Sequence, residues 1–68
     1  MTNTIATIIS TLRALADQEP GDRADAADSL IDDLVDDFKE GDGYYDFLLL
    51  YTPIELRDWL TREINENM

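Results

Sequence analysis

The spacing of hydrophobic residues predicts two long amphipathic helices in the first part of the chain. Between residues 4 and 16, apolar side chains recur every three or four positions, which places them on one face of an α-helix. Asn3 or Thr4 can cap its start. Residues 18–21 read Gln-Glu-Pro-Gly and interrupt the pattern, because proline and glycine together favour a turn. The spacing resumes at about residue 22 or 23 and continues to Glu40, where Gly41 is suited to end the helix.

The rest of the chain predicts one short helix and one longer helix. Residues 44–51 are apolar on every side, which suits either a short buried helix or a strand. Because a lone strand would have no pairing partner in a helical chain, we expect a short helix that fills the bundle. Residues 52–55 read Thr-Pro-Ile-Glu, a capping box with proline at the first helical position. We expect the helix that begins there to fray from Asn65 to Met68.

Together these segments predict an all-α fold. We expect a small bundle of three longer helices plus one short helix, in a single domain over residues 1–68. This length is below the roughly 70–80 residues at which one hydrophobic core gives ample stability. The predicted core consists of Ile5, Ile8, Ile9, Leu12, Leu15, Leu30, Ile31, Leu34, Val35, Phe38, Phe47, Leu56, Trp59, Leu60 and Ile64.

The composition argues against most catalytic chemistry, since the chain contains neither cysteine nor histidine. Without cysteine it has no disulfide and no thiolate nucleophile. Without histidine it lacks the commonest general base and the commonest transition-metal ligand. Any bound metal would have to be a hard, oxygen-ligated ion such as Mg²⁺ or Ca²⁺. We therefore expect a binding protein and not an enzyme, with no cofactor and no metal site.

The negative charge is concentrated in the middle of the chain. The net charge is −11. From Asp17 to Asp46, twelve acidic residues stand against two basic ones, whereas the rest of the chain carries four acidic and three basic residues. Such a field disfavours direct binding to nucleic acid or to an anionic membrane and favours a basic partner protein.

Most of this charge lies on the polar side of the helix predicted for residues 22–40. Aspartate is a poor helix former, and like charges three or four positions apart repel one another. The helix therefore gives up stability to hold its acids, which indicates a binding role. A generic solubilising face and an adaptation to high salt are the alternatives. The predicted partner-binding residues are Asp25, Asp28, Asp32, Asp33, Asp36, Asp37, Glu40, Asp42, Tyr44 and Tyr45.

Two short motifs in this helix carry resemblances of their own. Residues 32–37 read Asp-Asp-Leu-Val-Asp-Asp and resemble the magnesium–diphosphate motif of prenyl-transferring enzymes. Those enzymes need a large cavity and a second acidic motif, for which this chain has no room. Residues 28–30 read Asp-Ser-Leu and resemble the motif of acyl carrier proteins, which implies a phosphopantetheine arm on Ser29. The carrier serine opens its helix, whereas Ser29 falls inside the pattern, so this is an alternative.

The acidic helix also supports a resemblance to a class of inhibitors. Carboxylates that recur along a helix edge match a nucleic-acid strand in the sign and regular spacing of their charges. In size, low isoelectric point and aspartate-rich helix, the chain resembles the small acidic inhibitors of bacteriophages, among them the anti-CRISPR proteins. The resemblance implies a stoichiometric inhibitor, a DNA mimic that binds the basic nucleic-acid-binding groove of a host defence complex of the CRISPR type. It implies no direct contact with nucleic acid.

The sequence also bears on location and assembly. No basic segment precedes an apolar run near the N-terminus, and the longest apolar run, 47–51, is far shorter than the ~20 residues that cross a bilayer. We expect a cytoplasmic protein without membrane contact, located in the host cell if a phage encodes it. It would be a monomer or a weak homodimer. A homodimeric, antitoxin-like interaction subunit that uses the 47–51 run is a further alternative.

Overall fold

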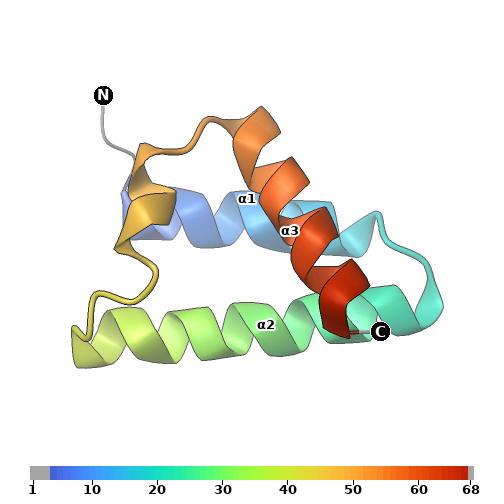
Figure 1. Ribbon diagram of the computed structural model, residues 1–68, viewed down its shortest axis with the longest axis horizontal. Helices are drawn as coiled ribbons and strands as arrows, with labels where there is room; N and C mark the ends of the chain where they lie inside the picture. The colour runs from blue at the N-terminus through green and yellow to red at the C-terminus, as the bar shows by residue number, and fades with distance from the viewer. Residues whose placement is uncertain (1–3, 68) are drawn as a thin grey trace.

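The computed structural model describes residues 4–67 and shows a small all-α fold (Figure 1). Its elements are α1 (Ile5–Asp17), α2 (Gly21–Glu40), the 3-10 helix η1 (Asp46–Leu50) and α3 (Pro53–Asn67). Helices α1 and α2 run antiparallel side by side, and α3 crosses them and packs on both. The segment η1 lies near the start of α1 and contacts it. The predicted fold class, three longer helices plus one short one, is therefore confirmed.

Local capping interactions fix where α1 and α3 begin. The Thr4 hydroxyl oxygen accepts a hydrogen bond from the backbone N–H of Thr7 at 3.1 Å, so Thr4 caps α1. At α3 the predicted capping box is present in both directions. The Glu55 N–H donates to the Thr52 hydroxyl at 3.3 Å, and the Thr52 N–H donates to the Glu55 carboxylate at 3.1 Å. Each pair satisfies N–H groups that a helix start leaves without intrahelical partners.

Helix α2 has 20 residues and thus spans about 30 Å. It begins at Gly21, directly after Pro20, close to the start predicted from the pattern. It ends at Gly41, which adopts the left-handed conformation with φ 75° and donates its N–H to the Asp37 carbonyl at 2.9 Å. Glycine adopts this conformation without the steric cost that a Cβ imposes, so the predicted stop at Gly41 is confirmed.

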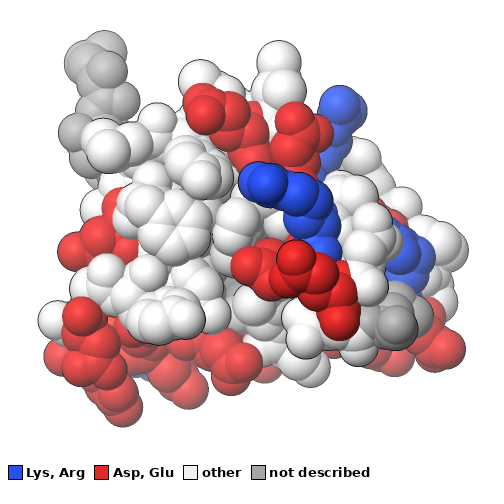
Figure 2. Space-filling view, viewed as in Figure 1, with Lys and Arg blue, Asp and Glu red and all other residues white. Residues whose placement is uncertain are grey.

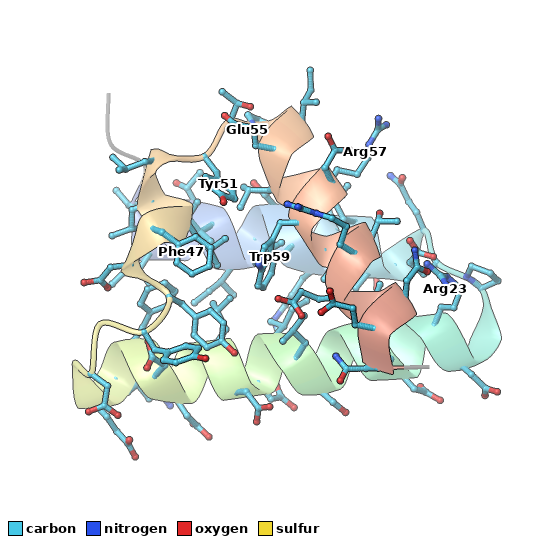
Figure 3. All side chains as sticks on the ribbon, in the orientation of Figure 1. Arg23, Phe47, Tyr51, Glu55, Arg57 and Trp59 are labelled. Atoms are coloured by element: carbon cyan, nitrogen blue, oxygen red, sulfur yellow. The ribbon has the colours of Figure 1, made fainter. Side chains whose placement is uncertain are left out.

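The prediction that α3 frays from Asn65 was wrong for the residues that the structure describes. The helix continues through Asn67, whose side-chain amide donates to the Glu63 carbonyl at 2.8 Å. Arg23 of α2 donates to the Asn65 side-chain oxygen at 2.9 Å and to Glu19 at 3.0 Å (Figure 3). This contact links the start of α2 to the last turns of α3, and nothing in the local sequence signals it. The predicted fraying of Met68 lies outside the described residues.

The core lies where the three helices meet. Most predicted core residues are buried or half-buried. Ile5 and Phe47 are corrections, since they are 42 % and 41 % exposed. The buried residues are Ile8, Leu12, Ala16, Ala27, Ile31, Leu34, Leu48, Leu56, Trp59, Leu60 and Ile64.

The segment η1 explains why Phe47 was misplaced. A 3-10 helix has three residues per turn, so the four consecutive apolar residues 47–50 cannot all lie on one buried side. Leu48 is fully buried and points into the bundle, whereas Leu50 is 73 % exposed. A short helix is present, but it covers Asp46–Leu50 and not the whole predicted segment 44–51, and Leu48 is its one buried side chain.

This difference within η1 gives a test of the fold. Leu48→Ala should destabilise the protein by about 2–5 kcal/mol, because it removes a fully buried side chain and leaves a cavity. Leu50→Ala, the matched control two residues away, should change the free energy of unfolding by no more than about 0.5 kcal/mol. Urea unfolding followed by circular dichroism measures both. Equal effects of the two substitutions would contradict this arrangement of η1.

Candidate functional site

The candidate site is built on the polar side of α2. We call this surface the acidic face, and it consists of Asp22, Asp25, Asp28, Asp32, Asp33, Asp36, Asp37 and Glu40. All of these residues are exposed except Asp37, which is half-buried. The opposite side of the helix carries the buried residues Ala27, Ile31 and Leu34. Figure 2 shows the acidic face as a band of Asp and Glu along the lower edge of the molecule, where α2 lies.

The acidic face divides into two rows. At ~100° per residue, Asp25, Asp28, Asp32 and Asp36 follow one edge of the helix, and Asp22, Asp33, Asp37 and Glu40 follow the other. The first row borders α1, because Arg13 of α1 approaches the Asp32 carboxylate to 3.4 Å. The second row borders the segment before η1, because the Tyr45 N–H donates to the Asp37 carboxylate at 3.2 Å.

Within residues 4–67, few cations balance the charge of the acidic face, and one of them is Lys39 in the last turn of α2. Among residues 4–67, Arg13–Asp32 is the one ion pair that an α2 carboxylate makes. Its side chains are 48 % and 74 % exposed, so water and salt screen it and it contributes little to stability. Arg23, although it belongs to α2, turns away from the acidic face toward Glu19 and Asn65. The face therefore presents strong negative charge to solvent.

A cluster of aromatic rings adjoins the second row. We call it the aromatic cluster, and it consists of Tyr44, Tyr45, Phe47, Tyr51 and Trp59. Neighbouring ring centroids are 5.1–6.3 Å apart, and most pairs meet edge to face, the arrangement that aromatic pairs favour. Figure 3 shows Phe47, Tyr51 and Trp59 in the space between η1 and α3.

Tyr45 joins the aromatic cluster to the acidic face. Its ring packs edge to face on Trp59 at 6.1 Å, and its backbone binds Asp37. Burial of the phenol raises its pKa above the ordinary value of 10.0, and the negative charges of Asp33, Tyr44, Glu63 and Asp37 raise this pKa further. Carboxylates of both α2 and α3 thus lie near this ring.

The structure brings most of the predicted site residues to one side of the molecule. The exposed acids of α2 continue into Asp42, which is exposed in the turn after the helix. Tyr44 is 75 % exposed, whereas Tyr45 is half-buried. Sequence reasoning missed two neighbours of this surface, Phe47 and Glu63. Phe47 could have been found by applying a three-residue period to 46–50, but no local signal places Glu63 near Tyr45.

The structure also bears on the metal-site, carrier-protein and membrane hypotheses. Among residues 4–67, no group of three or more His, Cys, Asp or Glu side chains is placed to hold a metal ion, the Asp-Asp-x-x-Asp segment included. Ser29 is exposed well inside α2, beside a shallow groove lined by Ala26, Leu30, Asp33 and Asn67. No helix within the described residues combines the length and the apolar character needed to cross a membrane.

The burial of Tyr45 generates a prediction about alkaline pH. A phenol whose pKa is raised by folding contributes stability that is fully present below about pH 10 and is lost as the pH rises through the folded-state pKa. The free energy of unfolding of the wild-type protein should therefore fall above about pH 10, and that of Tyr45→Phe should fall less. Urea unfolding of both proteins at a series of alkaline pH values measures the difference. Parallel declines would contradict the burial of this hydroxyl.

Comparisons with known proteins returned no match, whether with protein-family models, with curated protein sequences or with solved structures.

Proposed function

We propose that this protein is a stoichiometric inhibitor that binds a basic, nucleic-acid-binding groove of another protein through the acidic face of α2. The observation that carries the proposal is the exposure of that face. Its carboxylates lie on one side of a 20-residue helix. Within the described residues they form one ion pair, Arg13–Asp32, and Lys39 is the one cation in the last turn of the same helix.

The geometry of α2 suits the mimicry of a nucleic-acid strand. Carboxylates of the first row, at Asp25, Asp28, Asp32 and Asp36, recur once per turn, which is about 5–6 Å along the axis. A groove that binds phosphates offers regularly placed Arg and Lys side chains, and a rigid row of carboxylates can pair with them. Complementary charge would also accelerate the encounter with such a groove. The resemblance to anti-CRISPR inhibitors suggests a host defence complex as the partner.

The energetic cost of the acidic face favours a selected role. Acids three and four positions apart on one helix repel each other, and the aspartates near Glu40 also oppose the helix dipole. A protein that needed only solubility could spread its acids over all its surfaces. Here the C-terminal helix α3 carries a mixed set of charges that includes Arg57 and Arg62. The concentration of charge on α2 is therefore better explained by binding.

The position of Ser29 makes a carrier protein the weaker of the two hypotheses. It lies in the middle of α2, where intact helical turns precede and follow it, whereas a carrier serine opens its helix. Incubation with a phosphopantetheinyl transferase and coenzyme A, followed by intact-mass analysis, distinguishes the two. An added phosphopantetheine arm on Ser29 would favour the carrier function instead.

Reversal of charge on the acidic face tests the proposal. Asp25→Lys, Asp28→Lys and Asp36→Lys combined should weaken partner binding by about a hundredfold or more, because three attractions become repulsions. These three residues are exposed and form no ion pair within the described part of the chain, so the fold should be retained. The partner is captured from a lysate of the candidate host on immobilised wild-type protein. A duplex DNA or RNA competitor should then release the captured partner, because it occupies the same groove.

The matched control has the same net charge at other positions. Asp17→Lys, Asp58→Lys and Glu66→Lys combined also change the net charge from −11 to −5, at exposed residues outside the acidic face. This control variant should keep most of its affinity for the partner. In a separate salt series, rising ionic strength should release the partner from the wild-type protein, because salt screens the attraction between charges. Unchanged capture by the α2 variant, or a captured protein that nucleic acid does not displace, would refute the proposal.

A further inference from the structure

We infer that the aromatic cluster is an arginine-anchoring site that adjoins the acidic face and receives a basic segment of the partner. This inference rests on the proposed function and deepens it. The acidic face supplies long-range attraction for a basic surface. The aromatic cluster would supply the short-range contact in which a guanidinium group stacks on exposed rings.

Two rings of the aromatic cluster are exposed to solvent. Tyr44 is 75 % exposed and Phe47 is 41 % exposed, although both belong to a connected set of rings. Their inner neighbours are more buried: Tyr45 is half-buried, and Trp59 is 5 % exposed. The buried rings therefore hold the exposed ones in place. Figure 2 shows an uncharged area at the position of Phe47, with acidic side chains along α2 below it and on α3 beside it.

The charge beside the aromatic cluster is complementary to a cation. Carboxylates from two helices lie near Tyr45: Asp37 of α2 accepts a hydrogen bond from its backbone N–H, and Asp33 of α2 and Glu63 of α3 also act on its phenol. Aromatic faces attract cations, and nearby carboxylates add to this attraction. Arginine fits this combination better than lysine, because its planar guanidinium stacks on rings and donates in a fork to carboxylates. An arginine of a basic partner therefore satisfies both components of the surface.

The same charges argue against a second copy of this chain as the occupant. Each copy carries a net charge of −11, and the second row of the acidic face borders the cluster. A symmetric dimer through this surface would bring two such rows together, and like charges that face each other oppose association. A basic segment meets no such penalty.

Peptide binding tests the inference without knowledge of the natural partner. The probes are an oligo-arginine peptide and an oligo-lysine peptide of equal length. Trp59 is the single tryptophan and belongs to the cluster, so its fluorescence can follow binding. The wild-type protein should bind the arginine peptide more tightly than the lysine peptide. Tyr44→Ala and Phe47→Ala should each weaken arginine-peptide binding by about two- to fivefold and reduce the preference over lysine.

The controls separate this inference from the proposed function. Leu50→Ala removes another exposed apolar side chain of the same segment and should leave both affinities unchanged. The α2 charge variant (Asp25→Lys, Asp28→Lys and Asp36→Lys) should bind both peptides more weakly and still prefer the arginine peptide. If Phe47→Ala loses helical circular dichroism, the highly exposed Tyr44 provides the test alone.

Three results would overturn the inference. Equal affinity of the two peptides for the wild-type protein would remove the arginine preference. Unchanged affinity in Tyr44→Ala, together with weakened binding in the α2 charge variant, would leave the proposed function in place without an aromatic anchor. A wild-type dimer in sedimentation equilibrium that Tyr44→Ala dissociates would assign the surface to a second copy of the chain.

Discussion

The structure depends on the burial of one apolar face of α2, because repulsion between the carboxylates on the opposite face destabilises that helix. Ala27, Ile31 and Leu34 are completely buried, and α2 packs on both α1 and α3. Eight carboxylates on the same helix repel one another, and in proteins most helical stability comes from the tertiary packing of an amphipathic face. Packing must therefore hold α2 in place. In doing so it also fixes the direction in which the acidic face points.

A helix held in this way presents its charges on a rigid scaffold. The stop at Gly41 and the bond from Tyr45 to Asp37 fold the chain back along α2, so that the aromatic rings come to lie beside the second row. The contact of Arg23 with Asn65 ties the other end of α2 to α3. Both ends are thus joined to the rest of the bundle. Preorganisation of this kind lowers the entropy cost of binding, since the charges need no reordering on contact.

Local signals in the sequence predicted most of the fold, and long-range contacts account for the rest. Thr4, Gly41 and the Thr52–Glu55 pair act within one turn, so their roles follow from the residues themselves. Arg23 contacts the last turns of α3 at Asn65, which is 42 positions away in the sequence, and no pattern reveals that pairing. The positions on the acidic face followed from helical spacing alone. Its border with the aromatic cluster required the path of the chain through η1.

The two parts of the surface differ in how they act with distance and salt. Exposed carboxylates attract over about 8 Å at physiological ionic strength, and this attraction is weakly directional. Ring contacts act at van der Waals range and require a defined orientation of the partner group. Asp37 lies at the junction, and its carboxylate already accepts a backbone hydrogen bond from Tyr45. It is therefore less free than Asp25 or Asp36 to reorient toward a partner. Its hydrogen bond links the start of the aromatic cluster to the acidic face, so the two surfaces adjoin, as the proposed binding of a single partner to both requires.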